Sequence, residues 1–495
     1  MNRITKQWYH LQIIYSDFWR KCPALKFGIY FLMGIGSAIS LPTLFLLPVF
    51  FLFEKGSLLE KVKWISLSGV GFFYFFFLSL HDDKSPPKQG NFHFQIEEVK
   101  PHVGPFATSL VYIGKIDEKK PCRIYVKEKN RPLANASYLI EGGTLLRTAP
   151  YQYLLKTNKQ TRWIPEKNTR SSAEKRYRTK EKVKAFIKPY YKEKRSYDLM
   201  AALLSGTMEN RVLSFQFNQL GLQHLLAISG FHFSLLAFFL GLLFKSFLGV
   251  KWTAFFLLIC LALYFLYMGN SPSISRAWIG SLLVLISIFF HFKSSPLNAL
   301  GVAIIVAVIV DPLVTLQVGF QLSYIATLGI LLLYTPIEKG LRKIFQVKPF
   351  DKLLLMSHYD QYKYIFISFI RKIISLNLAV FVLTLPFLLF HFQKFPLLSL
   401  IYNLFIPLFI SGVIALLLIG SIFSLAIPTL GQWIHFINEK YALSLMNLIS
   451  HAPKKYSFYV RTPPFSFLLL LAIFTMILGF GIYFHQKAKN NFTNI

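Results

Sequence analysis

Long apolar runs fill most of the second half of this sequence. They lie at 231–248, 252–268, 277–291, 297–312, 318–334, 372–391, 400–424 and 466–484. Each run reaches or approaches the ~20 residues that an α-helix needs to cross a bilayer. Backbone polar groups in lipid must be satisfied within the segment, so runs of this kind predict helices. With 54% hydrophobic residues and 51 Phe, the sequence predicts a polytopic α-helical membrane protein.

The N-terminal segment predicts an uncleaved membrane anchor. Basic residues precede an apolar run at 27–53, and this run continues past the length of a signal-peptide core. GIGS at 34–37 and Pro42 interrupt the run, so it is either one long tilted span or a pair of short helices, and Pro42 favours the pair. A further run follows at 64–80. The pair would give three crossings before His81.

The pattern changes between residues 81 and 197. Short alternating segments rich in Val, Ile, Tyr and Phe replace the apolar runs, at 92–99, 109–116, 122–128 and 137–142. Alternation with turn residues between the segments predicts strands, and about 100 residues suffice for a domain. We therefore expect a small β-barrel or sandwich.

Four parts follow from these patterns. Membrane helices occupy 1–80, and the β-rich domain occupies 81–197. The segment 198–226 is amphipathic and too polar to span, which predicts helices along the membrane surface. The remainder, 227–495, is the main transmembrane domain.

The formal net charge is +32, and it is concentrated in the β-rich part, where 26 Lys and Arg face 12 Asp and Glu. The densest stretch, 174–197, mixes ten basic residues with aromatic ones. Cations that follow a phosphate backbone and rings that stack on bases suit single-stranded nucleic acid. A solvated helix or strand in a Lys-rich composition explains the same pattern, and both interpretations stay open. The candidate contacts are Lys175, Arg176, Tyr177, Arg178, Lys182, Lys184, Lys188, Tyr190, Tyr191, Lys194 and Arg195.

The charge of the connecting segments predicts the orientation. With the β-rich domain outside, the segments that fall inside carry most of the Lys and Arg; they are 249–252, 292–296, 335–371 and 425–465. The segments that fall outside carry only Arg276 and Lys394; they are 269–276, 313–317 and 392–399. This distribution agrees with the positive-inside rule. It predicts an extracytoplasmic β-rich domain after three crossings.

Four polar clusters interrupt the apolar runs. Their members are His224, Ser229, Gly230 and His232; Asn270, Ser273, Ser275 and Arg276; Gln317, Gln321 and Ser323; and Asn403. Polar groups at membrane depth are costly unless they pair or face a cavity. Hydrogen bonds between helices account for such residues, and a lined pathway accounts for them equally. Arg276 is compatible with a snorkelling anchor or with a group that attracts phosphate.

Catalytic motifs are missing around these clusters. Ser229 and His232 have no G-x-S-x-G elbow, and His224 and His232 are too far apart on a straight helix to chelate one metal. The sequence has no P-loop. The spacing of Cys22, Cys122 and Cys260 fits neither a metal motif nor a disulfide framework. We therefore expect no catalytic residues, metal or cofactor, and conduction rather than catalysis.

The four clusters resemble the motifs of the ComEC family, the inner-membrane DNA channel of natural transformation. HLLAISGFHFSLL at 224–236 is similar to that family's HLLAISGLHVGLL, with Phe231 and Phe233 in place of Leu and Val. YFLYMGNSPSISRAW at 264–278 is similar to its Y-x-x-x-x-G-x-x-x-S-x-x-R-A segment. DPLVTLQVGFQLSYIATLG at 311–329 matches its D-P and G-F-Q-L-S elements, and IYNLFIPLF at 401–409 resembles its N-x-x-x-P element.

The resemblance implies a channel for single-stranded DNA in the bacterial cytoplasmic membrane, with an extracytoplasmic OB-fold domain. It implies membrane lipids, an extracytoplasmic DNA receptor and a cytoplasmic helicase-like ATPase as partners. Many members carry a C-terminal metallo-β-lactamase-like domain that these 495 residues do not contain, so no nuclease activity is expected here. Some members have a disulfide in the OB-like domain. Cys122 is the only cysteine between 81 and 197, so that bond is not expected.

Two other classes of function remain open. One is a membrane enzyme for lipid-linked substrates with His224 or His232 as general base, which activity without DNA would favour. The other is a transporter for a small solute with the β-rich domain as a docking module. Failure of the isolated 92–197 fragment to bind DNA at physiological salt would favour that class.

Overall fold

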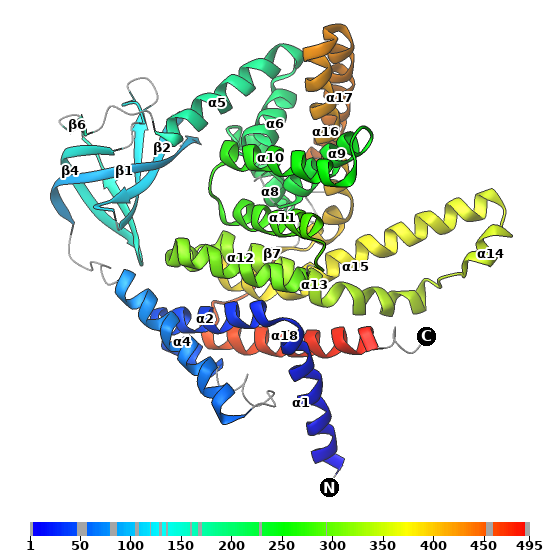
Figure 1. Ribbon diagram of the computed structural model, residues 1–495. Coiled ribbons are helices and arrows are strands. Elements are labelled where there is room, and N and C mark those ends of the chain that lie inside the picture. Colours follow the sequence, from blue (N-terminus) through cyan, green and yellow to red (C-terminus); the bar gives the residue numbers. More distant parts are fainter. Residues whose placement is uncertain are drawn as a thin grey trace. The chain divides into compact units, whose positions relative to one another are not determined.

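Helices dominate the fold (Figure 1). The computed structural model describes residues 3–46, 57–79, 87–103, 108–118, 120–127, 131–134, 137–158, 161–166, 171–226, 230–293, 295–451 and 459–490. Within these residues seven helices are long and apolar enough to cross a membrane, and a bent helix pair at the N-terminus brings the number to eight if it counts as one span. The prediction of a multi-pass α-helical membrane protein is confirmed.

The chain forms two compact units, which we describe separately. The first comprises Met1–Leu78, Ser275–Phe405 and Phe458–Ile495, and the second comprises Ser79–Ile274 and Ile406–Ser457.

The first unit is a helical bundle with a short two-stranded sheet. Its elements are α1 (Arg3–Lys21), α2 (Pro23–Ile39), η1 (Leu41–Phe45), α4 (Leu58–Ser79), most of α11 (Pro272–Phe290), α12 (Pro296–Val310), η4 (Pro312–Leu316), α13 (Val318–Ile344), α14 (Phe350–Leu354), α15 (His358–Phe392), β7 (Lys394–Pro396), the start of α16 (Leu398–Ala426), β8 (Tyr459–Arg461) and α18 (Phe467–Asn490).

Small residues let the helices of this bundle approach closely. A Cβ on Gly301 of α12 would lie 2.3 Å from the backbone of Ala24 in α2, and one on Gly329 of α13 would lie 2.5 Å from Ala379 O in α15. Close backbone contact through small residues is how membrane helices gain packing energy without a hydrophobic driving force.

The N-terminal helices meet at a sharp bend. α1 and α2 form an angle of 99°, and Pro23 opens α2, where its missing N–H costs nothing. α1 leaves Trp8, Tyr9 and Ile13 exposed. Pro42 falls in η1, but residues 47–56 lie outside the described part. Whether 27–53 forms one span or two therefore stays a prediction.

The predicted sides of 392–399 and 425–465 are not both right. β7 pairs antiparallel with β8, with Lys394 opposite Arg461, so residues predicted outside lie next to residues predicted inside. The segment 425–465 was predicted as a loop but contains the helix α17 (Pro428–Ser450), which follows α16. α17 is not among the described helices that are long and apolar enough to cross a membrane. Polar residues such as Asn438 and Glu439 give this helix the appearance of a loop in the sequence.

Close contacts support this helical hairpin. A Cβ on Gly431 in α17 would lie 2.3 Å from Ser424 in α16, and one on Gly420 in α16 would lie 3.0 Å from the His435 ring. In the first unit, Lys339 in the last turns of α13 donates a hydrogen bond to Ala488 O in α18.

The second unit contains a six-stranded sheet. Its strands are β1 (Lys88–Val103), β2 (Thr108–Ile116), β3 (Lys120–Lys127), β4 (Ser137–Ala149), β5 (Gln152–Lys156) and β6 (Arg162–Pro165). The order is β1-β2-β3-β5-β4-β6, and β1 also pairs with β4. β3 and β5 are parallel. Alternate residues such as Phe94, Tyr112 and Ile124 point into one core and are fully buried. The four predicted strand segments all lie in β1–β4, whereas the short β5 and β6 were not predicted.

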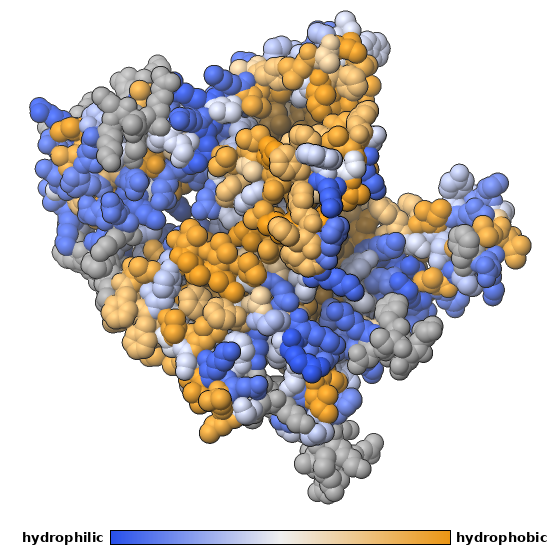
Figure 2. Space-filling view, viewed as in Figure 1, coloured by the Kyte–Doolittle hydropathy of each residue, from blue (hydrophilic) through white to orange (hydrophobic). Residues whose placement is uncertain are grey.

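Helices complete the second unit. They are α5 (Ser172–Ile187), η3 (Lys188–Tyr190), α6 (Lys194–Ser205), α7 (Arg211–Gln219), α8 (Gln223–Leu226), α9 (Gly230–Lys245), α10 (Val250–Met268), the larger part of α16, and α17. The amphipathic segment 198–226 is mostly helical. Leu199 and Phe217 are buried within the unit, whereas Val212 and Phe215 are exposed. Figure 2 shows hydrophilic residues over the strands and mainly hydrophobic ones over α9 and α10.

Candidate functional site

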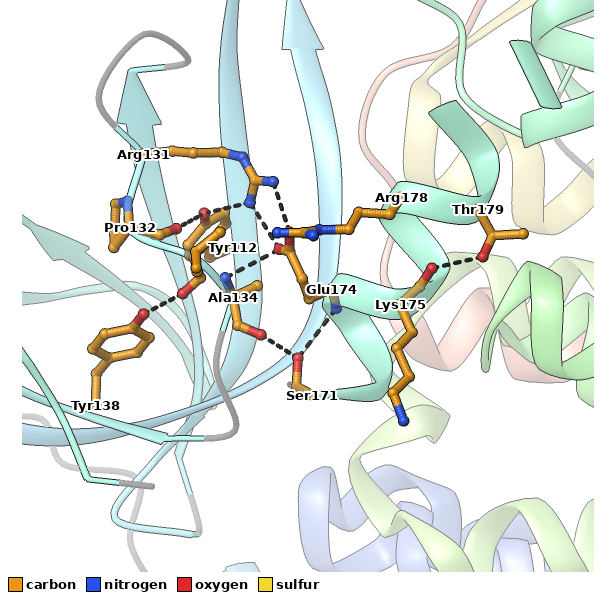
Figure 3. A network of polar contacts seen from close by, with 11 residues as sticks. Tyr112, Arg131, Pro132, Ala134, Tyr138, Ser171, Glu174, Lys175, Arg178 and Thr179 are labelled. Carbon is orange, nitrogen blue, oxygen red and sulfur yellow. Dashed lines mark hydrogen bonds and ion pairs between the residues drawn. The ribbon is translucent and has the colours of Figure 1, made fainter. Parts of the chain in front are cut away.

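A buried carboxylate fixes the start of the basic helix α5 to the β-strands (Figure 3). The Ser171 side chain caps the helix by accepting from the Glu174 N–H at 3.1 Å. The Glu174 side chain is 1% exposed. It accepts two N–H groups of Arg131 at 2.8 and 2.9 Å, the Ala134 N–H at 3.1 Å and the Arg178 Nε at 2.7 Å. Both oxygens of the Glu174 carboxylate are therefore held by charged or backbone N–H donors.

The electrostatics of Glu174 follow from these contacts. Burial alone would raise the pKa of the carboxyl, but the hydrogen bonds from Arg131, Arg178 and Ala134 outweigh burial and lower the pKa to about 2. Arg131 also lies over the Tyr177 ring, 4.7 Å from its centroid. Arg131 and Glu174 thus hold α5 in a fixed place on the β-rich domain.

One face of α5 carries exposed basic residues. Lys175, Arg178 and Lys182 line a hollow of about 200 Å³ together with Glu174 and Thr179. Lys188, Lys194 and Arg195 are exposed further along the segment. Lys184 differs, because it is buried and paired with Glu181 at 2.8 Å and with Glu209. The exposed members are placed where a polyanion could reach them.

Three tyrosines of 174–197 pack against other parts of the protein, whereas Phe186 is 37% exposed. Tyr177 lies beneath Arg131 against the β-rich core. Tyr190 stacks on the His435 ring at 4.5 Å, and Tyr191 is 5% exposed, with its hydroxyl 2.9 Å from His435 Nδ1. A base needs an accessible ring face to stack. In this structure, then, Lys175, Lys182 and Lys188 face solvent and Tyr191 does not.

The other side of α5 meets the second polar cluster. Lys180 Nζ donates to Met268 O at 3.2 Å, and the Arg176 side chain lies 3.4 Å from the place of a Cβ on Gly269. Gly269 has φ +93°, a conformation that favours glycine. The loop that continues into Asn270 and Ser273 therefore starts against the basic helix.

Cations crowd this contact. Burial lowers the pKa of Lys180 to about 8; Glu98 opposes the shift, and Lys100 and Arg176 reinforce it. Arg176 also donates to Glu97 O at 2.5 Å. A lysine whose charge is this costly lies where an anion would relieve both burial and repulsion.

The first polar cluster lies in the same unit. His224 is exposed and its Nδ1 lies 3.1 Å from Gly221 O. His232 is 3% exposed, and the two imidazoles interact electrostatically. Gly230 begins α9. Ser229 lies outside the described residues, so its predicted place in the cluster stays a prediction.

The third cluster, Gln317, Gln321 and Ser323, belongs to the first unit, which also contains Arg276 of the second cluster. Arg276 Nη1 donates to Ser323 O at 2.7 Å, which joins α11 to α13. Gln321 Nε2 donates to Thr315 O at 3.0 Å, and its Oε1 lies 2.7 Å from His391 Nε2. The structure thus places Arg276 of α11 against the first turns of α13, which carry Gln321 and Ser323. His391 was missed, because a lone histidine in an apolar run gives no signal.

Gln317, Ser275 and Asn403 lie in this unit too. Gln317 is the residue before α13, and Ser275 lies in the first turn of α11. Asn403 Oδ1 is buried without a hydrogen-bond partner, although a buried amide oxygen is normally paired. The predicted site residues are therefore divided between the two units.

A second polar network was not predicted. Tyr191, His435, Asn438 and Glu439 meet in the interior of the second unit. Asn438 Nδ2 donates to the Tyr191 hydroxyl at 3.0 Å, and Glu439 accepts from Ser196 Oγ at 2.9 Å. The spacing of 435, 438 and 439 puts them on one helix face, and that pattern was the available signal. In the described part of the chain, no three His, Cys, Asp or Glu side chains form a group that could hold a metal ion.

Apolar spans with polar clusters at their ends, joined to a basic β-rich domain, define a polytopic membrane protein. The family model described as "Competence protein" matches residues 208–486. That is more than half of the 495 residues, and the chain belongs to the competence protein family.

A curated relative supports this assignment. The chain is 27% identical over 244 residues to ComE operon protein 3 of Bacillus subtilis (strain 168). The match covers 47% of this chain and 28% of that protein, so it spans less than a third of the relative's length. No solved structure matches the chain.

Proposed function

We propose that this protein passes single-stranded DNA through the bacterial cytoplasmic membrane during natural transformation, as a conduit and not as an enzyme. The observation that carries the proposal is the contact between α5 and the loop after α10. Lys180 binds Met268 O and Arg176 lies against Gly269. The most basic segment of the chain thus adjoins one of the polar clusters that match the competence family.

The β-rich part is proposed to be an OB-like barrel outside the membrane. Support comes from the pairing order, because β1 pairs with β2, β2 with β3, β3 with β5, β5 with β4, and β4 again with β1. A ring of pairings of this kind is typical of small barrels that bind oligonucleotides. The exposed lysines of α5 would then extend its binding surface.

The polar clusters are proposed to form the entry and the conduit. His224, Ser229, His232 and Arg276 would shape the entry, and Gln317, Gln321, Ser323 and Asn403 would line or brace the path. Arg276 gives one N–H to Ser323 O, and a guanidinium has five N–H donors. The remaining donors suit a phosphate oxygen.

Energy and delivery are proposed to come from partners. A cytoplasmic helicase-like ATPase would pull the strand, and an extracytoplasmic receptor would present it. The sequence has no P-loop of its own.

A charge-matched pair of variants tests the proposal. Lys175, Lys182 and Lys188 are changed to Gln together in the full-length protein, and binding of labelled oligo-dT is measured against salt. Each phosphate contact contributes about 0.7 to the slope for single strands. We expect the slope to fall by about 2. The control changes Lys343, Lys352 and Lys363 to Gln and should leave the slope unchanged.

Uptake tests the conduit. A deletion strain is complemented with Arg276→Gln or Arg276→Lys, and entry of labelled DNA is measured. We expect Arg276→Gln to reduce uptake at least tenfold and Arg276→Lys to retain more of it. Wild-type uptake with Arg276→Gln, together with an unchanged salt slope in the triple variant, would refute the proposal.

A further inference from the structure

The last turns of α13 and the middle of α15 line a basic pocket that none of the polar clusters uses. A cavity of about 280 Å³ is lined by Tyr334, Thr335, Glu338, Lys339, Arg342 and Lys372. This volume is close to the lower limit of ~300 Å³ for ligand pockets. The pocket lies entirely within the first unit.

The charges of this pocket favour an anion. Glu338 and Arg371 are 5% and 4% exposed, and Arg371 Nε lies 3.3 Å from Glu338 Oε1. Arg371 also donates to Phe345 O at 3.0 Å, which holds it at the end of α13. Glu338 pairs with both Arg342, at 2.6 Å, and Arg371. The lining therefore sets one carboxylate against the three cations Lys339, Arg342 and Lys372.

The helix lengths place the pocket at the membrane surface. Glu338 lies 20 residues after Val318, where α13 begins, and Lys372 lies 20 residues before Phe392, where α15 ends. At 1.5 Å per residue both distances are about 30 Å, the thickness of the hydrocarbon core. The pocket is thus at the level of the lipid headgroups. The basic segment 335–371 places it on the inner side.

The surface next to the pocket is apolar on the membrane side. Leu376 is 41% exposed, and it lies one helical turn deeper than Lys372 on the same face of α15. A cationic pocket above an exposed apolar turn matches a molecule with an anionic head and acyl chains. Nucleic acid has no group for the apolar part.

We propose that this pocket binds the phosphate headgroup of an anionic phospholipid from the inner leaflet. Basic pockets between membrane helices on this side suit such headgroups. Lys339 and Lys372 contact the phosphate, and Arg342 is kept in place by its ion pair with Glu338 at 2.6 Å. The inference does not depend on the proposed function.

The test measures lipid binding to the full-length protein in detergent. Phosphatidylglycerol or phosphatidylcholine is titrated, and bound lipids are counted by native mass spectrometry. Each lysine near an anionic surface is worth about a factor of five. Lys339→Gln with Lys372→Gln should therefore weaken phosphatidylglycerol binding about 25-fold, and Lys372→Gln alone about fivefold. The double change to Arg should retain binding.

Two controls make the assignment refutable. Lys348→Gln with Lys352→Gln removes the same charge from the same basic segment outside the pocket, and should leave binding unchanged. An equal loss in this control would overturn the site. Inorganic phosphate and oligo-dT serve as competing probes. Displacement of phosphatidylglycerol by either one at comparable concentration would show a free-phosphate or nucleic-acid site, and would overturn the lipid assignment.

Discussion

Removing the charge of Glu174 should loosen α5 from the β-rich domain. The pKa of this carboxyl falls from an ordinary 4.5 to about 2 in the folded protein. At 1.36 kcal/mol for each pH unit, the difference corresponds to about 3 kcal/mol. The cost of breaking a buried ion pair, roughly 3–5 kcal/mol, is similar, and the 17% exposure of Arg131 favours the lower end. Glu174→Gln keeps the shape and removes the charge.

Hydrogen exchange measures this loss directly. A change of about 3 kcal/mol raises the opening constant on the order of 100-fold, provided that exchange follows the opening equilibrium. The amides in the first turn of α5 are the reporters. Glu181→Gln is the matched control on the same helix, because Glu181 is 46% exposed in its pair with Lys184, and such pairs contribute about 1 kcal/mol or less. Similar exchange in both variants would refute the role of the buried ion pair between Glu174 and Arg131.

Further predictions concern pH, close packing and the buried network. The lowered pKa of Glu174 stabilises the fold fully above pH 4.5, and this contribution should disappear between pH 4.5 and about 2; acid unfolding of Glu174→Gln should lack that portion. Gly301→Ala should lower the melting temperature in detergent, since its Cβ would lie 2.3 Å from the α2 backbone, whereas Gly280→Ala meets open space and should not. Tyr191→Phe leaves buried partners on α17 unpaired and should destabilise the protein by about 1–3 kcal/mol in denaturant titrations, whereas Tyr125→Phe, at an exposed ring, should change stability by less than ~0.5 kcal/mol.

The sequence predicts the elements of this fold better than their connections. Apolar runs and alternating segments locate the helices and β1–β4, because each pattern reports the environment along a single element. The helix α17 was not predicted, because its polar residues contact η3 and α6, which are distant in sequence. The Tyr191 hydroxyl bonded to Asn438 is such a partner. Because the sequence pattern treats 425–465 as one loop, 459–461 was assigned to the opposite side from 394–396, with which it pairs.

The candidate site shows the same division. Spacing indicated that Gln321 and Arg276 were unusual polar residues, and the structure links Arg276 to Ser323. Spacing could not reveal that Tyr191 is buried or that His391 contacts Gln321. These facts depend on tertiary neighbours, which a pattern within one segment does not contain.

The contacts of α5 also show that fewer of its basic residues are available to an anionic ligand than its composition suggests. Arg178 pairs with the buried Glu174, and the buried Lys184 pairs with Glu181 and Glu209. Lys175, Lys182 and Lys188 remain in water. A strand bound along this helix would therefore displace fewer counterions than the ten basic residues between 174 and 197 suggest. The number of ions released on binding therefore measures how many of these cations are available to phosphate.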